Sequence, residues 1–413
     1  MKVAAIIAEY NPLHNGHEFQ IKKAKELTNA DYIIVVMSGN FTQRGIPAII
    51  DKYERTKMAL LAGADLVLEL PLYYSSSSAE YFASGAINLL KKIGCVDYLV
   101  FGSECGDIKI LTDIAELLIN HKDKISEVIH NKVREGMSYP AARVNAIEEA
   151  IPNSYNHVEA MASPNNILGF EYIRAIRQFN AKIEPVTNLR IGSDYHDKII
   201  DTENQISSAL AIRSSLEELD DIEKIKDQVP SYVYEILYNN YKNTFPILNE
   251  DISSILKYKL LLDAGNGYEE YVDISSDFSD KILKNLNKYV SYSQFCDLLK
   301  SKDITYARVA RNLLHILLNI KKDSMKKYKE NGYIFYARML GFKKSSSALL
   351  TRIKETSSLP LITKLADARN LLTPLGMEML ETDIQAAHIY DTIVTEKYHA
   401  ATVSEFSHEM IIL

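Results

Sequence analysis

The chain has 413 residues, of which 47% are hydrophobic and 24% charged, and its formal net charge is −7. These fractions exclude a disordered chain, the length predicts two or three domains, and no apolar run reaches the ~18 residues of a membrane span. Three scattered cysteines, and a start that leads into an apolar run without a signal peptide, predict a reducing, cytoplasmic location.

Short apolar runs alternate with helix-length segments over roughly the first 215 residues. The runs lie at 3–8, 32–37, 66–68 and 98–101, and residues 182–186 are predicted as a further strand. Runs without polar alternation, separated by helices, predict a parallel sheet that is covered on both faces. Helix starts are predicted at Ser77, which opens a capping box, and at Pro164, and Gly94 is predicted to end the first of these helices.

The second half of the sequence has a different pattern. From about residue 252 onwards the β-rich runs stop and helical periodicity dominates. The predicted fold class is therefore α/β, with an N-terminal Rossmann-like domain that contains a parallel sheet, followed by a mainly α-helical C-terminal domain. We place the two domains at residues 1–235 and 236–413.

Two histidines three residues apart follow the first predicted strand, in His14-Asn15-Gly16-His17. A helix that starts here presents free N–H groups and a positive dipole end, which suits phosphate. Gly16 lets a nucleotide approach the backbone, and the imidazoles can donate hydrogen bonds to phosphate oxygens. Two exposed histidines at a helix start are the alternative. A zinc site is disfavoured because no third and fourth ligand is evident, so we predict no metal-binding residues.

A second group of hydrogen-bond donors precedes another predicted helix. Ser207 and Ser208 lie at its start, where Ser207 can cap it, and Arg213 follows about one and a half turns later. Hydroxyl groups and an arginine at a helix start can hold phosphate. A plain helix cap is the alternative.

These two motifs, in this order, resemble those of the nucleotidyltransferase superfamily. Residues 14–17 match its His-x-Gly-His motif, and residues 206–213 are similar to its Ile-Ser-Ser-Thr-x-x-Arg type motif, with Ala209 in place of Thr. Further segments narrow the resemblance to the bacterial tRNA(Met) cytidine acetate ligases. They are residues 9–12, 37–45, 57–60, 68–71, 101–104, 163–169, 190–195 and 337–342.

The resemblance implies a two-step ligase. Acetate attacks the α-phosphate of ATP to give acetyl-adenylate and pyrophosphate, and the acetyl group then passes to N4 of the wobble cytidine of elongator tRNA(Met). Mg²⁺ is expected beside the triphosphate. The resemblance assigns residues 1–235 to a nucleotidyltransferase-like, ATP-binding catalytic domain and residues 236–413 to an α-helical tRNA-binding domain.

The resemblance also implies the site residues. His14 and His17 are the predicted catalytic residues, and Ser207, Ser208 and Arg213 lie on the pyrophosphate side. The predicted ATP-binding residues are Ile7, Ala8, Glu9, Tyr10, Asn11, Pro12, Leu13, His14, Asn15, Gly16, His17, Glu18, Phe19, Gln20, Gly102, Asn165, Arg190, Ile191, Ser207, Ser208 and Arg213.

One basic segment stands out in the acidic chain. Residues 302–354 contain thirteen basic and three acidic residues, a net charge of +10. Helical spacing predicts Arg308, Arg311, His315 and Lys322 on one face, and aromatic residues such as Tyr328 and Tyr336 are interleaved. Cations for phosphates and aromatic rings for unstacked bases indicate a single-stranded RNA loop as the partner. The predicted tRNA-binding residues are Arg308, Arg311, Lys343, Lys344 and Arg352.

The residues themselves leave alternatives open. The basic segment can be a solvated face whose aromatic residues lie in the core. The phosphate motifs also fit an adenylyl- or cytidylyltransferase that acts on a small metabolite, or a non-catalytic RNA-binding protein with a nucleotide-sensing pocket. The sequence makes no prediction of oligomeric state.

Overall fold

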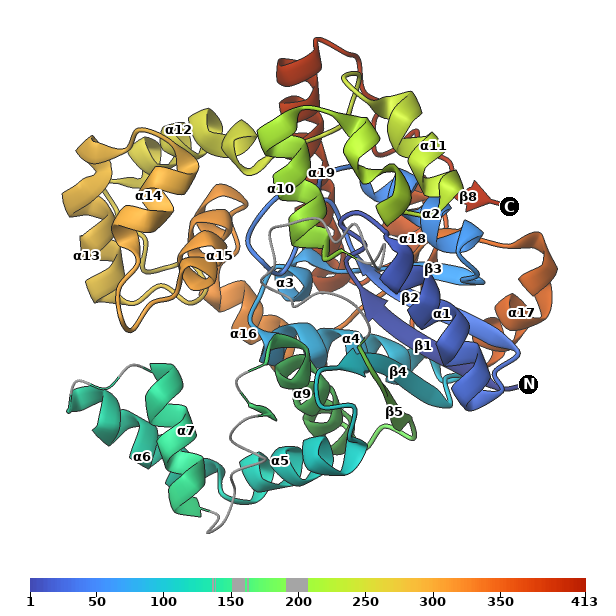
Figure 1. Ribbon diagram of the computed structural model, residues 1–413, viewed down its shortest axis with the longest axis horizontal. Helices are drawn as coiled ribbons and strands as arrows, with labels where there is room; N and C mark the ends of the chain where they lie inside the picture. The colour runs from blue at the N-terminus through green and yellow to red at the C-terminus, as the bar shows by residue number, and fades with distance from the viewer. Residues whose placement is uncertain (136, 138, 151–159, 162, 191–206) are drawn as a thin grey trace.

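Figure 1 shows the fold of the protein as a computed structural model. The structure describes residues 1–135, 137, 139–150, 160–161, 163–190 and 207–413. A central sheet lies between helices that cover both of its faces, and helices from the second half of the chain extend to one side (Figure 1).

Among the described residues, eight strands form one sheet in the order β5-β4-β1-β2-β3-β6-β7, and β8 pairs with β6. The pairs among β1 to β5 are parallel, whereas β6 runs antiparallel to β3. The predicted α/β fold with a largely parallel sheet is confirmed. The strands are β1 (Val3–Ala8), β2 (Tyr32–Ser38), β3 (Leu66–Leu70), β4 (Tyr98–Ser103), β5 (Glu184–Leu189), β6 (Ala337–Phe342), β7 (Leu361–Ile362) and β8 (Ile411–Ile412).

The side chains of β1 alternate between two hydrophobic cores, one on each face of the sheet. Val3 and Ala5 belong to one core, and Ala4 and Ile6 belong to the other. Successive side chains of a strand point to opposite faces, so a strand that is covered on both faces needs apolar residues at every position. This explains why β1 appears in the sequence as a continuous apolar run.

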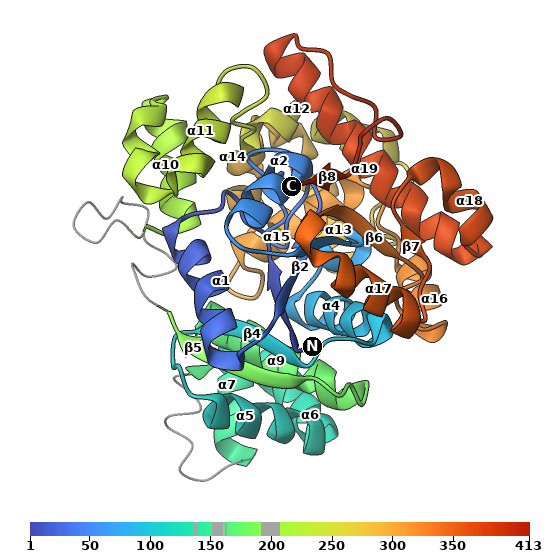
Figure 2. The ribbon, with the colours of Figure 1, turned by 90° about the vertical axis from the view of Figure 1, so that its right-hand side faces the viewer.

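The helices that cover the two faces come from both halves of the chain (Figure 2). The smaller core contains residues of α1 (Asn15–Thr28), α2 (Lys52–Leu61), α10 (Ala209–Leu219) and α11 (Ser231–Asn240). The larger core contains residues of α3 (Leu72–Ser75), α4 (Ala79–Ile93), α5 (Ile108–Asn120), α6 (Lys122–Arg134), α7 (Tyr139–Ala150), α9 (Pro164–Gln178), α12 (Ser253–Asp263), α13 (Ser276–Asn285), α14 (Tyr292–Leu299), α15 (Tyr306–Leu317), α16 (Lys322–Glu330), α17 (Ser347–Thr356), α18 (Ala368–Leu371) and α19 (Pro374–Tyr398). Among the helices that the structure describes, none combines the length and the apolar character needed to cross a membrane.

The predicted helix ends are partly confirmed. α9 begins at Pro164, and α4 ends at Gly94, whose φ of +76° lies in the left-handed region that favours glycine. The capping box predicted at Ser77 is wrong. Ser78 is the N-cap of α4, and the Ser77 hydroxyl instead donates a hydrogen bond to the Tyr73 carbonyl at 2.6 Å.

The expectation that strands stop after residue 252 is also wrong. β6, β7 and β8 belong to the second half of the chain and extend the sheet beyond β3. The run that forms β6 contains the charged residue Arg338 and is only six residues long, so its apolar pattern is weak. These strands extend a sheet whose other strands belong to the first half of the chain. The division into two domains at residue 235 stays a prediction.

Candidate active site

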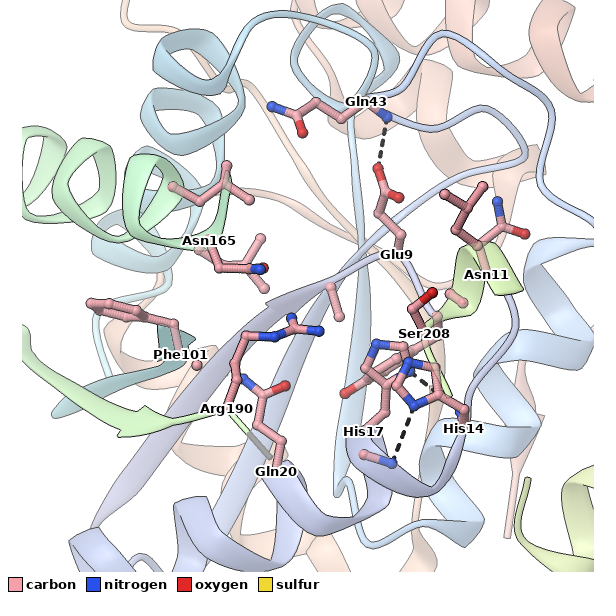
Figure 3. Close-up of a pocket in the computed structure, with 18 of the residues that line it drawn as sticks. Glu9, Asn11, His14, His17, Gln20, Gln43, Phe101, Asn165, Arg190 and Ser208 are labelled. Carbon is pink, nitrogen blue, oxygen red and sulfur yellow. Dashed lines mark hydrogen bonds between the residues drawn. The ribbon is translucent and has the colours of Figure 1, made fainter. Parts of the chain in front are cut away.

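A pocket lies at the carboxyl ends of the parallel strands, where the strand order reverses between β1 and β4 (Figure 3). Ligands of open α/β sheets bind at this position, because the loops that follow neighbouring strands diverge there. The residues that line it are Ile7, Ala8, Glu9, Tyr10, Asn11, His14, Gly16, His17, Phe19, Gln20, Gln43, Arg44, Phe82, Phe101, Gly102, Asn165, Leu168, Tyr172, Asn188, Arg190, Ser207, Ser208, Ala209, Leu210 and Arg213.

The two predicted catalytic histidines stand at the start of α1. Their rings are stacked, with 3.7 Å between centroids. His14 is the N-cap of α1, and its Nδ1 accepts a hydrogen bond from the Gly16 N–H at 3.1 Å. Nδ1 of His17 accepts one from the His14 N–H at 3.3 Å. A ring nitrogen that accepts carries no proton, so each neutral ring has its proton on Nε2 and offers a donor to a ligand.

Both imidazoles are held in the neutral form. Burial, together with the positive charges of Arg190 and Arg213, lowers the pKa of His14 to about 3. Burial, His14 and Arg190 hold the pKa of His17 well below its usual value. The pocket therefore combines fixed positive charge from arginines with uncharged N–H donors.

The start of α10 brings the second predicted motif to the same pocket. The residue that caps α10 is Ser208 rather than Ser207, and its hydroxyl oxygen accepts a hydrogen bond from the Ala211 N–H at 3.1 Å. The Ser207 N–H donates to the side chain of Gln228 at 3.0 Å. Nη1 of Arg213 donates to the Asn11 carbonyl at 2.6 Å, which ties α10 to the turn between β1 and α1.

The end of β4 and the start of α9 form the opposite wall. A Cβ atom at Gly102 would lie 3.1 Å from Cγ of Arg190, so glycine lets this arginine lie close to the strand. Nδ2 of Asn165 donates to Glu104 at 2.6 Å, and the same carboxylate accepts from the backbone N–H groups of Asn165 and Asn166. Glu104 thus orients the first turn of α9, where a negative charge is favoured.

Most residues predicted to bind ATP line this pocket. The exceptions among the described residues are Pro12, Leu13, Asn15 and Glu18. Leu13 is fully buried in the smaller core. The Asn15 side chain donates to the Asp227 carbonyl at 2.8 Å, and Glu18 pairs with Lys22 at 2.9 Å. Ile191 lies outside the described residues. Contact with ATP stays a prediction for every residue of this set.

Other lining residues were not assigned to the site from the sequence. Gln43 and Arg44 come from the loop between β2 and α2, and lie within the segment 37–45 that contributed to the resemblance. Phe82, Leu168 and Tyr172 come from α4 and α9. Aromatic and aliphatic residues inside amphipathic helices have the pattern of ordinary core residues, so no local signal marks them as site residues.

Arg55 of α2 fixes the backbone beneath the pocket. Its guanidinium is fully buried and donates to the carbonyl oxygens of Glu9 at 2.7 Å, Ser38 at 3.0 Å and Gly39. Its Nε donates to the Ile50 carbonyl at 3.0 Å. One side chain therefore holds together the carboxyl ends of β1 and β2 and both ends of the loop between β2 and α2.

This loop connects the pocket to the helices of the second half. Gly45 has a φ of +80°, and a Cβ atom there would lie 2.3 Å from the backbone nitrogen of Arg311 in α15. The Tyr292 hydroxyl donates to the Gly45 carbonyl at 2.9 Å. Only glycine allows both this conformation and this approach, so α15 packs directly against the loop that lines the pocket.

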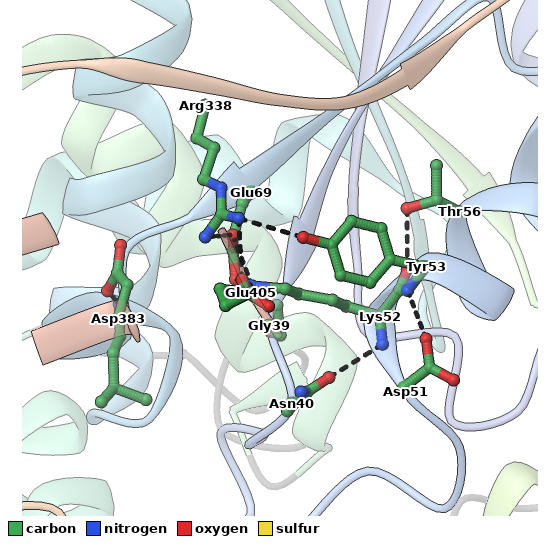
Figure 4. A network of polar contacts seen from close by, with 12 residues as sticks. Gly39, Asn40, Asp51, Lys52, Tyr53, Thr56, Glu69, Arg338, Asp383 and Glu405 are labelled. Atoms are coloured by element: carbon green, nitrogen blue, oxygen red, sulfur yellow. Dashed lines mark hydrogen bonds and ion pairs between the residues drawn. The ribbon is translucent and has the colours of Figure 1, made fainter. Parts of the chain in front are cut away.

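A buried cluster of charges lies near the carboxyl end of β3, at the same end of the strands as the pocket (Figure 4). Lys52 lies 2.8 Å from Glu69 and also pairs with Glu405. Arg338 lies 3.0 Å from Glu69 and 2.7 Å from Glu405. Two positive and two negative side chains balance one another, which offsets the cost of burying them. The cluster joins α2, β3, β6 and the segment that precedes β8.

The residues predicted to bind tRNA lie on two separate parts of the structure: Arg308 and Arg311 on α15, and Lys343, Lys344 and Arg352 on or before α17. β6 pairs Phe342 with Leu66 at the amino end of β3. The second group therefore follows β6 at the end of the strands away from the pocket, and Figure 1 shows α15 and α17 far apart, at the left and the right of the view.

His315 does not lie on an exposed basic face, and that expectation is wrong. Its ring is fully buried, and its two nitrogens lie 3.0 Å from the carbonyl oxygens of Val272 and Ser76. Tyr328 and Tyr336 are also buried in the larger core. These two rings are therefore not available to stack on RNA bases, as the alternative interpretation of the segment anticipated.

Comparisons with known proteins identify the family. A family model described as HIGH Nucleotidyl Transferase matches residues 1–405. A tRNA(Met) cytidine acetate ligase from Clostridium perfringens is 40% identical over 398 residues, covering 94% of this chain and 95% of the relative. Another, from Acetivibrio thermocellus, is 36% identical over 419 residues and covers both chains completely. The chain belongs to the tRNA(Met) cytidine acetate ligase family.

Solved structures extend this similarity to the fold. The crystal structure of Thermotoga maritima TmcAL in its apo form matches with a TM-score of 0.93 at 30% identity, covering all of both chains. The same protein bound with alpha-thio ATP matches with a TM-score of 0.90, again over both complete chains. The resemblance of this sequence to the tRNA(Met) cytidine acetate ligase family is therefore confirmed.

The neutral state of His14 predicts an effect of pH on stability. The unfolded chain takes up a proton at this ring near pH 6.5, whereas the folded chain does so near pH 3. Between these values the unfolded state binds more protons, so the free energy of unfolding decreases as the pH falls. In His14→Asn, whose side chain can still cap α1, urea denaturation at pH 7 and pH 5 should show a smaller decrease than in the native chain. Equal decreases of the free energy of unfolding in the two chains would contradict the assignment of a neutral, buried ring to His14.

The buried cluster predicts an effect in more acid solution. Burial favours the neutral form of Glu405, but Lys52 and Arg338 outweigh it and lower its pKa to about 2. We expect Glu405→Gln to reduce the free energy of unfolding by about 3 kcal/mol at pH 7, because an uncompensated positive charge stays buried. The carboxylate stabilises fully above its unfolded pKa of about 4.3 and less as the pH falls toward 2. The difference in free energy of unfolding between Glu405→Gln and the native chain should therefore shrink below about pH 4. A difference that stays constant with pH would refute the pairing of Glu405 with Lys52 and Arg338.

Proposed function

We propose that the protein is an ATP-dependent ligase that activates acetate as acetyl-adenylate and acetylates N4 of the wobble cytidine of elongator tRNA(Met). The observation that carries the proposal is the match, over nearly the whole chain, to proteins named tRNA(Met) cytidine acetate ligase. The pocket supports it, because both predicted phosphate motifs line one cavity at the switch point of the sheet.

The charges of the pocket suit a triphosphate. Arg190 and Arg213 supply positive charge, and the starts of α1 and α10 direct backbone N–H groups and helix dipoles toward the same space. When acetate attacks the α-phosphorus, negative charge grows on the phosphoryl oxygens. The Nε2–H groups of His14 and His17 are held in place to donate to such oxygens, and donors that need no rearrangement stabilise a transition state most effectively.

The two steps follow from the reactivity of the groups. A carboxylate is a poor acyl donor, and adenylation gives it a good leaving group. The exocyclic amine of cytosine is a weak nucleophile, because its lone pair is delocalised into the ring, and it requires an activated acyl donor. One pocket that holds the adenylate until the tRNA nucleotide arrives meets both needs.

Magnesium enters this scheme as part of the MgATP substrate. Within the described parts of the chain, no group of three or more His, Cys, Asp or Glu side chains could hold a metal ion. Phosphate oxygens and water are ligands that Mg²⁺ prefers, and they suffice for an ion that arrives with the nucleotide. The cytoplasmic location expected from the sequence stays a prediction.

The test of function uses radiolabelled acetate, ATP and elongator tRNA(Met) transcript. Acid-precipitable label should require both ATP and the tRNA, which separates a tRNA ligase from a transferase acting on a metabolite and from a non-catalytic sensor. His17→Ala removes one donor and should lower acetate-dependent ATP–pyrophosphate exchange on the order of 10²- to 10³-fold, without unfolding the protein. A native chain that gives no labelled tRNA would overturn the proposal.

We further propose that Arg308 and Arg311 contact the tRNA backbone, since α15 packs against the loop that lines the pocket. Replacing both with Ala should weaken tRNA binding while ATP affinity persists. The slope of log affinity against log salt should fall by about two, one for each lost phosphate contact. The double variant Lys343→Ala, Lys344→Ala tests in the same assay whether the basic residues that follow β6 also contact the tRNA. Unchanged affinity in the Arg308, Arg311 variant would remove these contacts from the proposal.

A further inference from the structure

One acidic side chain lines a pocket that is otherwise positively charged. Among the lining residues that the structure describes, Glu9 carries a carboxylate, whereas Arg44, Arg190 and Arg213 carry positive charges. A carboxylate repels a triphosphate, so the contact with ATP predicted for Glu9 from the family resemblance leaves its charge unexplained. The charge is explained by a ligand group that donates hydrogen bonds.

Glu9 is fixed at both its backbone and its side chain. The carboxylate oxygen Oε1 accepts a hydrogen bond from the Gln43 N–H at 2.8 Å. The Glu9 carbonyl accepts one from the buried Arg55 at 2.7 Å. A carboxylate offers about four acceptor positions on its two oxygens, and the bond from Gln43 uses one of them. The side chain is thus held in place and keeps the capacity to accept from a ligand.

The position of Glu9 separates it from the phosphate motifs. Figure 3 shows Glu9 and Gln43 together at one end of the pocket, with Arg190 and the two histidines at the other. The loop that contains Gln43 also contains Gly45, which packs against the backbone of Arg311 in α15. The end of the pocket that contains Glu9 is therefore the end nearest the proposed tRNA contacts.

We propose that Glu9 accepts a hydrogen bond from the exocyclic amine of the acyl-accepting cytosine and takes up the proton that this amine loses. The inference rests on the proposed function. It assigns Glu9 a role in the second step, the transfer of the acetyl group to the cytosine. Cytosine presents an N4 amino group as a donor, and Glu and Asp side chains are the ones that accept from it in nucleic-acid recognition. The amine needs such an acceptor, because amide formation leaves it with an excess proton.

The transfer step balances with this assignment. The N4 lone pair attacks the acetyl carbonyl carbon, the new C–N bond forms, and the bond between that carbon and the phosphate oxygen breaks. AMP leaves with the electron pair of the broken bond. The nitrogen passes one proton to the Glu9 carboxylate, which later releases it to water. No oxidant, reductant or further reactant takes part.

The test compares Glu9→Gln with the native chain in the two half-reactions. The glutamine can still accept the Gln43 N–H through its amide oxygen but takes up no proton. Acetate-dependent ATP–pyrophosphate exchange reports that the variant is folded and measures what the change does to adenylation. Transfer from chemically supplied acetyl-adenylate to elongator tRNA(Met) should fall on the order of 10²-fold further than exchange does, the effect of losing a general base. Glu26→Gln, at an exposed site of α1, is the matched loss of charge and should leave both steps unchanged.

Two results would overturn the inference. A parallel loss of exchange and transfer in Glu9→Gln would assign the carboxylate to the nucleotide or its metal ion. Transfer within about threefold of native would show that Glu9 takes no proton in the reaction. Both results need a native chain that acetylates tRNA. A native chain that fails to do so overturns the proposed function itself, and this inference with it.

Discussion

The arrangement of the pocket depends on one buried cation, the guanidinium of Arg55. The carbonyl groups of Glu9, Ser38 and Gly39, where β1 and β2 end, all accept from this side chain. Leaving such buried acceptors unpaired costs about 1–3 kcal/mol each, so one arginine with five donors removes a large penalty. Burial lowers the pKa of Arg55, yet a guanidinium remains protonated. The first turn of the site and the loop beside it are thereby fixed relative to each other.

Two groups of charges at this edge of the sheet are balanced in different ways. The cluster of Lys52, Glu69, Arg338 and Glu405 is neutral as a whole and buried, so it contributes to structure and has no charge left for a ligand. Burial, together with the excess of positive charge that the pocket keeps, disfavours protonation of the adjacent histidines. An anionic ligand compensates that excess. Its oxygens can then accept hydrogen bonds from the Nε2–H groups of His14 and His17.

The sequence predicted the parts of the site that a local pattern encodes. The turn after β1 and the start of α10 each combine a helix start with particular residue types, and both line the pocket. Phe82 and Tyr172 lie there through packing of distant segments, which leaves no trace in their own neighbourhood. β6 was missed because Arg338 interrupts a short run, and its charge is compensated by Glu69 and Glu405 far away in the sequence. His315 has helical spacing typical of an exposed face, but carbonyl groups on other segments give it a buried partner on each side.

The position of β6 has a consequence for the order in which the protein is assembled. The amino-terminal part of a chain leaves the ribosome first, so β3 is complete long before β6 can pair with it. Until the segment beyond residue 337 emerges, β3 is an unpaired edge that other chains can extend. Glu69 meets Arg338, and Lys52 meets Glu405, at the same late moment, and Ile411 then pairs with Gly341 of β6. Closing the sheet edge and neutralising its buried charges thus become a single late event, which favours chaperone protection of the nascent chain.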